Sequence, residues 1–296
     1  MTKEKYLILF KEYLHKEYKD SSTNAYCFIV SRFLTHYPCP LNLSMQDIVN
    51  YLADMQQENV TDMYRSVNLL AIKKFFNMLF YNEMISFHPC YNLQISGRKK
   101  SGINFAMLYT MPQMEKMLKQ IKGYSEAIEI RDKLLFSFFI YQGITLGECI
   151  KLKIDNIDLN EGVLKITKTY LVPRTICLHP AQSVLGYRYL TECREKLSKS
   201  AANDVLFLSK DGTHLTTSGV YSIFKRLARN TNTVDISPMK IRKSVISYWT
   251  NIRKFKLLDV QIMAGHTMPS TTERYYDKND EKMRRIIEKK HPINFM

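Results

Sequence analysis

Hydrophobic side chains recur at helical spacing in four segments near the N-terminus, and polar or proline-containing stretches separate these segments. The second segment ends at Pro38. The third opens with Ser44 and Asp47, three residues apart as in a capping box. The pattern therefore predicts a compact bundle of four helices, within residues 2–18, 21–37, 43–58 and 61–84.

The pattern after residue 107 is again mostly helical, with one exception. Thr110 precedes Pro112 as a cap precedes the first turn of a helix, and residues 131–143 read as a largely apolar helix. Residues 162–180 instead alternate and are β-branched, which predicts two short strands joined by a turn around 170–173. The other expected elements are a small strand and turn within 204–216 and helices at 181–199, 216–230, 238–254, 257–266 and 280–290.

A break in the helical pattern separates the two regions. Proline, two glycines and a run of basic residues fall within residues 86–107, so this stretch is the best linker candidate. We expect a mainly α fold with a small antiparallel β-sheet, divided into a helical domain at 1–88, a linker at 89–107 and a second domain at 108–296.

Charge points to a polyanionic partner. The chain has 43 Lys and Arg against 28 Asp and Glu, a net charge of +15. Nucleic acid is favoured over membrane because no amphipathic basic helix stands alone. Arg98, Lys99 and Lys100 lie in the linker, where they suit a strap on DNA phosphates. An ordinary basic enzyme and a solvated linker are the alternative interpretations.

Cysteine spacing and hydropathy exclude several classes. The six cysteines show no C-x-x-C spacing, which favours free thiols in a reducing cytosol over a zinc site or a disulfide framework. No run of eighteen apolar residues occurs, and the N-terminus meets charge too early for a signal peptide. We therefore expect a cytoplasmic protein without a membrane span.

Six stretches, taken in order, carry a family resemblance. They include YQGITLGECIKLKIDNIDL at 141–159, the Lys-bearing GVLKITK, SPMKIRKSV at 237–245 and MAGHTMPSTTERYY at 263–276. The chain resembles the tyrosine recombinases, also called phage-type integrases. Corresponding stretches in that family read roughly T-G-L-R-x-x-E-L-x-x-L-x-x-x-D-I, a Lys-bearing hairpin, H-x-L-R-H, and L-G-H followed by a threonine and, three residues after it, a tyrosine. Six matches in order are far more specific than any single one.

The resemblance implies a role for each matching residue. Tyr275 is the expected nucleophile, which attacks a DNA phosphate and forms a 3′-phosphotyrosyl ester while a 5′-hydroxyl leaves. Tyr276 falls one place late, and a slip of one residue is the alternative. Arg242 would hold phosphate oxygens, His266 would donate to one, and Lys168 would protonate the leaving oxygen. The ester stores the bond energy, so the resemblance implies no metal or cofactor.

Two positions depart from the family pattern. Thr145 stands where the family has its first arginine, and Met239 stands where it has a histidine. Losing one preorganised oxyanion donor costs about 3–4 kcal/mol, roughly a hundred- to thousandfold in rate. We expect another cation to fill the first gap, and Arg174 is the first candidate because it shares the Lys-bearing hairpin. Lys240 and Lys243 are weaker candidates, and both suit DNA binding.

The expected function is therefore that of a two-domain DNA recombinase closing as a clamp on duplex DNA, in mobile-element integration or excision. The resemblance implies a homotetramer in the synaptic complex, assembled in part by the tail at 277–296. An ordinary amphipathic helix that packs on its own core is the alternative for that tail. Two alternatives stay open. One is a DNA-binding relative of the same fold with weakened or lost catalysis, and the other is a basic RNA-binding or scaffold protein with accidental motif matches.

Overall fold

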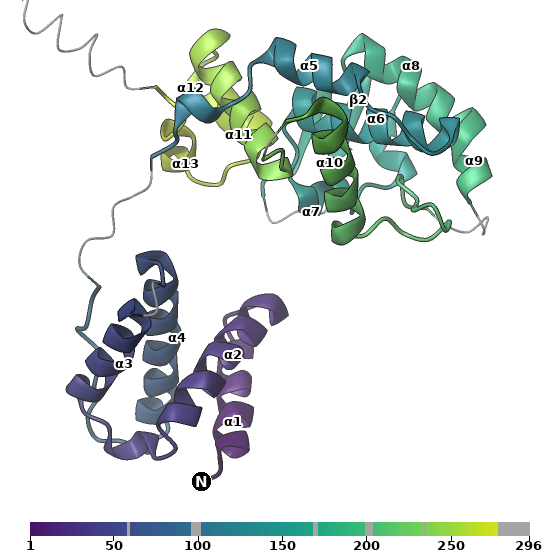
Figure 1. Ribbon diagram of the computed structural model, residues 1–296. Coiled ribbons are helices and arrows are strands. Elements are labelled where there is room, and N and C mark those ends of the chain that lie inside the picture. Colours follow the sequence, from purple (N-terminus) through teal and green to yellow (C-terminus); the bar gives the residue numbers. More distant parts are fainter. Residues whose placement is uncertain (58–59, 96–101, 168–170, 199–203, 234, 278–296) are drawn as a thin grey trace, which may run out of the picture. The chain divides into compact units, whose positions relative to one another are not determined.

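The computed structural model describes residues 1–57, 60–95, 102–167, 171–198, 204–233 and 235–277. Within these ranges the chain forms two compact units, Met1–Ser101 and Gly102–Met296 (Figure 1). Each unit has a hydrophobic core of its own. Among the described helices, none is both long and apolar enough to cross a bilayer.

The described part of the N-terminal unit is built from four helices, and short polar side chains cap the starts of the first, third and fourth. Thr61 accepts a hydrogen bond from the Tyr64 backbone N–H at 3.3 Å. Ser44 and Asp47 bond each other reciprocally, which confirms the predicted capping box. The elements are α1 (Lys3–His15), α2 (Asp20–His36), the 3₁₀ turn η1 (Pro40–Asn42), α3 (Met45–Gln57) and α4 (Asp62–Tyr81).

Aromatic side chains fill the core of this unit. Phe75 on α4 packs edge to face against Phe10 on α1 and against Phe76. The core continues past α4, because Cys90 is buried at 1% exposure. In the C-terminal unit, Ile103 packs against the other core. Cys90 and Ile103, both within the predicted linker at 89–107, therefore pack with the cores of the N-terminal and C-terminal units, respectively.

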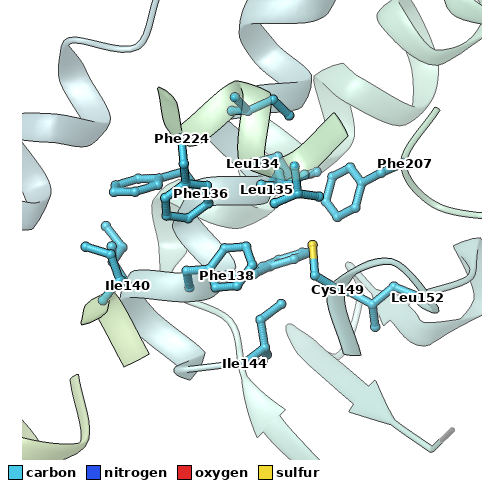
Figure 2. Close-up of a cluster of buried hydrophobic side chains, with 14 of the residues drawn as sticks. Leu134, Leu135, Phe136, Phe138, Ile140, Ile144, Cys149, Leu152, Phe207 and Phe224 are labelled. Carbon is cyan, nitrogen blue, oxygen red and sulfur yellow. The ribbon is translucent and has the colours of Figure 1, made fainter. Parts of the chain in front are cut away.

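The C-terminal unit surrounds one buried helix. Helix α6 (Glu126–Gln142) is buried on nearly every side, and its Phe136 and Phe138 pack with Phe224 and Phe207, respectively (Figure 2). The surrounding helices are α5 (Met111–Lys119), α7 (Leu146–Cys149), α8 (Pro180–Arg188), α9 (Arg194–Leu197), α10 (Thr217–Thr231), α11 (Pro238–Ser247), α12 (Leu257–Ala264) and α13 (Pro269–Glu273), with 3₁₀ turns η2 (Phe105–Met107) and η3 (Ile154–Asn156).

The predicted hairpin is part of a three-stranded antiparallel sheet. Strand β1 (Ile157–Asp158) pairs with β2 (Val163–Ile166), which pairs with β3 (Arg174–Cys177). In β2, Leu164 and Ile166 are buried and alternate with the exposed Lys165. The register sets Ile166 opposite Arg174, so that arginine occupies an inward position at the start of β3.

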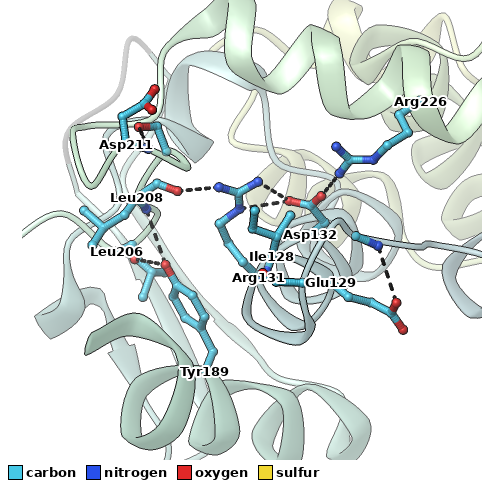
Figure 3. Close-up of polar contacts among 12 residues, drawn as sticks. Ile128, Glu129, Arg131, Asp132, Tyr189, Leu206, Leu208, Asp211 and Arg226 are labelled. Carbon is cyan, nitrogen blue, oxygen red and sulfur yellow. Dashed lines mark hydrogen bonds and ion pairs between the residues drawn. The ribbon is translucent and has the colours of Figure 1, made fainter. Parts of the chain in front are cut away.

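A buried ionic network ties α6 to its neighbours (Figure 3). Arg131 binds Asp132 at 2.7 Å and donates to the Leu208 carbonyl at 2.7 Å. Asp132 also pairs with Arg226 on α10. Burial raises the pKa of Asp132, against the opposing effect of the two arginines. Removing one partner of such a buried pair is typically strongly destabilising, because it leaves a charge without compensation.

One expected strand and two expected helices differ from the structure. The small strand expected within 204–216 is present only as isolated bridges, Lys153 to Val205 and Leu208 to His214. The helices expected at 181–199 and 238–254 each contain a π-helical turn, η4 (Tyr189–Cys193) and η5 (Tyr248–Ile252). The helix expected at 280–290 lies outside the described residues.

Candidate active site

Four side chains from separate elements are buried in one part of the C-terminal unit. Arg174 comes from β3, Arg242 from α11, His266 from the turn after α12, and Tyr275 from the turn after α13. They are 7%, 6%, 6% and 9% exposed. We call these residues the four-residue cluster. Buried charges and polar rings of this kind need partners, and the contacts below supply them.

Arg242 is held by the carbonyls that follow two helices. It lies one turn into α11, which Ser237 caps by accepting from the Lys240 N–H at 3.2 Å. Its Nη1 donates to the Gly143 carbonyl after α6, and its Nη2 donates to the Ala264 carbonyl at 2.6 Å. Burial lowers the pKa of Arg242 to about 10, so the guanidinium stays charged at neutral pH.

His266 follows a glycine that the turn requires. Gly265 has φ +70°, a left-handed conformation that ends α12. Nδ1 of His266 lies 2.9 Å from the Thr272 hydroxyl. Burial, together with the smaller effect of the positive charges of Arg242 and Arg174, lowers the pKa of His266 to about 4. The imidazole is therefore neutral at pH 7. When Thr272 donates to Nδ1, the ring proton sits on Nε2, where it is available to a phosphate oxygen.

Tyr275 and Tyr276 have different surroundings. The Tyr275 ring lies nearly parallel to the His266 ring, with centroids 6.0 Å apart and planes 22° apart. Burial raises the pKa of Tyr275, whereas the positive charge of Arg242 opposes that rise. Tyr276 is 37% exposed. The structure thus brings Tyr275, and not its neighbour, next to the histidine.

Arg174 reaches the same place from the sheet. Its Nη1 and Nη2 donate to the two carboxylate oxygens of Glu148 at 2.6 and 3.1 Å, and its Nε donates to the Met263 carbonyl at 2.8 Å. A Cβ at Gly265 would lie 2.5 Å from Nη1 of Arg174. The guanidinium therefore lies directly against the backbone that precedes His266.

Thr145 has become a helix cap. Its hydroxyl accepts from the Glu148 N–H at 3.2 Å, and Glu148 accepts from the Thr145 N–H at 2.7 Å, a complete capping box for α7. Burial alone would raise the pKa of Glu148, but the hydrogen bonds and charge of Arg174 hold it below its usual range. Glu148 thus connects Thr145, which lacks a guanidinium group, to Arg174 on β3.

The other predicted residues lie outside the four-residue cluster or outside the described residues. Met239 is 63% exposed and lines a surface pocket with Lys240 and Lys243. Lys240 is paired with Asp235 at 3.3 Å, and its Nζ lies 4.7 Å from the Tyr109 ring centroid. The expectations for Lys168, Arg98, Lys99 and Lys100 fall on residues outside the described ranges.

Three residues that touch the cluster or its segment were missed from the sequence. Glu148 carried a signal, because T-x-x-E is the spacing of a capping box. Thr272 matches the threonine of the family pattern, without indicating its bond to His266. Asn251 donates to the Tyr275 carbonyl at 2.8 Å, a contact across distant elements that no local pattern reveals. Across the described residues, no group of three or more His, Cys, Asp or Glu is arranged to hold a metal ion.

Acidification is expected to destabilise the protein through His266. The folded pKa of about 4 lies below the ordinary value of 6.5, so the unfolded chain binds a proton between those values. The stabilising contribution of the neutral ring is complete above pH 6.5 and is lost as the pH falls to 4, a window worth about 3 kcal/mol. Urea unfolding at pH 7.0 and 4.5 should show a larger loss for wild type than for His266→Gln. Equal losses would contradict the prediction.

Comparisons with known proteins agree with this geometry. The phage integrase family model matches residues 109–282, more than half of the chain. Tyrosine recombinase XerD of Listeria monocytogenes is 24% identical over 255 residues, which cover 86% of this chain and 84% of the relative. Tyrosine recombinase XerC of Oceanobacillus iheyensis is 23% identical over 302 residues, covering 98% and 96%.

Solved structures confirm the fold. The integrase of transposon Tn1549 in complex with a circular intermediate DNA superposes with a TM-score of 0.74 at 16% identity, covering 96% of this chain and 99% of that one. The XerH recombinase bound to its difH substrate gives a TM-score of 0.69 at 18% identity, covering 88% and 78%. The mainly helical fold with a small antiparallel sheet is thus confirmed, and the chain belongs to the phage integrase family of tyrosine recombinases.

Proposed function

We propose that the chain is a site-specific DNA recombinase that cleaves and rejoins duplex DNA through a 3′-phosphotyrosyl intermediate on Tyr275. The observation that carries this proposal is the burial of two guanidinium groups and a neutral imidazole around one tyrosine. A phenol is a poor nucleophile at neutral pH, and burial makes Tyr275 poorer still in the absence of DNA. The positive charge of Arg242 favours the developing phenolate, and both guanidinium groups would bind the phosphate that it attacks.

Each member of the four-residue cluster has its own role in the proposed reaction. Arg242 and Arg174 offer N–H donors to the non-bridging oxygens of the scissile phosphate, whose negative charge grows in the transition state. His266 donates from Nε2 to one of those oxygens. Tyr275 Oη releases its proton to solvent water and forms the new bond to phosphorus as the bond to the 5′-oxygen breaks. Lys168 remains the proposed proton donor to that leaving oxygen.

Arg174 replaces the arginine that Thr145 lacks. Glu148 follows Thr145 by three residues, and Arg174 binds its carboxylate through two nitrogens. We propose that the guanidinium has moved from α7 to β3 while acting on the same phosphate. This relocation supports retained catalysis over the alternative of an inactive DNA-binding relative.

The partners and setting follow from the same proposal. The Tn1549 integrase and XerH structures contain DNA substrates, which supports duplex DNA as the partner of this chain. We propose a homotetramer in the synaptic complex and a cytoplasmic location, where the DNA lies. Integration or excision of a mobile element is the proposed biological event, and the linker residues Arg98, Lys99 and Lys100 are proposed contacts to its phosphates.

A library of nicked duplexes tests this function. Randomised duplexes with a nick near the centre trap any covalent intermediate, because the short fragment beyond the cut diffuses away. We expect protein–DNA adducts that survive denaturing gels, form without added metal ions, and yield one recurring sequence on recovery. Tight binding to that sequence without any adduct would favour the DNA-binding alternative.

Salt is expected to weaken DNA binding steeply. With a net charge of +15 and phosphate contacts dominating the interface, each neutralised phosphate releases counterions. A protein making 6–10 phosphate contacts loses about 10³- to 10⁵-fold in affinity between 50 and 200 mM salt. Fluorescence anisotropy with the recovered duplex measures this slope. A dissociation constant that stays constant over that salt range would contradict the phosphate-dominated interface.

A further inference from the structure

A side chain at the end of α11 binds the backbone of the segment that carries Tyr275. Asn251 lies on the π-helical turn η5, at the C-terminal end of α11. Its Nδ2 donates to the Tyr275 carbonyl at 2.8 Å, and its Oδ1 accepts from the Asp277 backbone N–H at 3.0 Å. Both backbone groups that flank Tyr276 are therefore bound to the same amide.

The orientation of that amide is fixed by a third contact. Nδ2 of Asn251 also donates to the Ser247 hydroxyl at 3.0 Å, one helical turn earlier. Two oxygens therefore face the nitrogen of the amide, and one N–H faces its oxygen. This arrangement uses both ends of the amide in the way its chemistry allows.

The π-helical turn explains why Asn251 points toward this segment. The Arg253 N–H bonds the Tyr248 carbonyl at 2.9 Å, five residues back, so the helix is wider here than an α-helix. Such a turn places an extra residue in the helix and changes the direction of the side chains that follow α11. π-Helical turns occur frequently at functional sites.

The Asn251 contacts flank two adjacent tyrosines, Tyr275 and Tyr276. Tyr275 is 9% exposed beside His266, whereas Tyr276 is 37% exposed. A shift of the backbone by one residue would exchange them. The short turn after α13 also has backbone bonds from the Tyr275 N–H to the Thr272 carbonyl at 2.9 Å and from the Tyr276 N–H to the Glu273 carbonyl at 3.1 Å.

We propose that Asn251 is a positioning residue that fixes the register of the nucleophile segment, so that Tyr275 and not Tyr276 faces the phosphate. The proposal rests on the proposed recombinase function. Asn251 touches neither DNA nor the reacting atoms in this account. It acts through the peptide groups on both sides of Tyr276, and its two bonds must hold while the tyrosine attacks.

The test measures the rate of adduct formation at saturating nicked duplex. Asn251→Ala is expected to slow adduct formation by about ten- to hundredfold, the factor that two ordinary hydrogen bonds supply. Asn251→Asp keeps the shape but sets an oxygen against the Tyr275 carbonyl, and it should be similarly slow. Ser247→Ala is the matched control, because it removes the third bond and leaves both segment bonds in place; we expect a rate within about twofold of wild type.

The identity of the attached tyrosine separates register from general stability. Mass spectrometry of the digested adduct should find Tyr275 in wild type and a new Tyr276 adduct in the Asn251→Ala, Tyr275→Phe double variant. Wild-type rates in both Asn251 variants, or an equal loss in Ser247→Ala, would overturn the proposal. A wild-type protein that forms no adduct would instead refute the recombinase function itself.

Discussion

Tyr275→Phe is expected to abolish covalent attachment to a nicked duplex while leaving DNA binding nearly unchanged. The substitution removes only the phenolic oxygen that forms the bond to phosphorus, and the ring keeps its place beside His266. The adduct is measured on a denaturing gel and the affinity by gel shift. Binding should change by less than about twofold, because phosphate contacts to basic residues dominate it.

Tyr276→Phe is the matched control for this prediction. It makes the same chemical change one residue later, on a side chain that is 37% exposed. We expect adduct formation close to the wild-type rate. Adducts that survive Tyr275→Phe and disappear in Tyr276→Phe would assign the nucleophile to Tyr276 and contradict the assignment made from burial.

Arg174→Ala is expected to slow adduct formation by roughly a hundred- to thousandfold. The change removes one preorganised donor set from a buried site, and the loss of a single such donor has about this effect. Arg174→Lys should be nearly as slow, because an ammonium group cannot bind Glu148 through two nitrogens while facing a phosphate. Single-turnover rates on the nicked duplex measure both effects.

Loss of Arg174 also leaves Glu148 buried without its partner, so stability must be separated from chemistry. The double variant Arg174→Ala, Glu148→Gln removes that uncompensated charge. It should fold, as judged by thermal unfolding, and still react slowly. A well-folded double variant with the wild-type rate would show that Arg174 has no catalytic role.

Two further measurements address the relocation itself. Thr145→Arg in the Arg174→Ala background returns a guanidinium to the family position and should recover part of the lost rate. A methylphosphonate at the scissile position removes one phosphate charge, so the defect of Arg174→Ala should become smaller on that substrate. No recovery by either route would indicate that Arg174 stabilises the fold without acting on the phosphate.

The fold class and the site residues that lie in family motifs could be predicted from the sequence. Helical periodicity and the alternation in residues 162–180 predicted the helices and the hairpin, since both depend on local patterns. Strand β1 and the π-helical turns were missed, because a two-residue strand and a five-residue turn are too short to show a periodic pattern of their own. Within the predicted linker, Cys90 packs in the core of the N-terminal unit, a contact that its local sequence does not reveal.

The candidate site shows the same division. Arg242, His266 and Tyr275 followed from motifs, and the structure brings them together. Arg174 was a candidate only because it shares a hairpin with Lys168, and its bond to Glu148 required coordinates. The alternation of β3 offered an additional signal, because it sets Arg174 on the same face as the half-buried Ile176.

Chance motif matches are excluded as an explanation of the sequence. The family model spans residues 109–282, and relatives cover nearly the whole chain. The RNA-binding or scaffold interpretation is therefore wrong. The departures from the family pattern at Thr145 and Met239 differ in their surroundings. The capping partner of Thr145, Glu148, binds the buried Arg174, whereas Met239 is exposed at the surface.

Peptide mapping of the wild-type covalent adduct identifies the attacking residue. After nuclease and protease digestion, we expect a nucleotide joined through its 3′-phosphate to Tyr275 in the peptide that follows His266. A nucleotide on any other residue, or joined through a 5′-phosphate, would contradict that expectation.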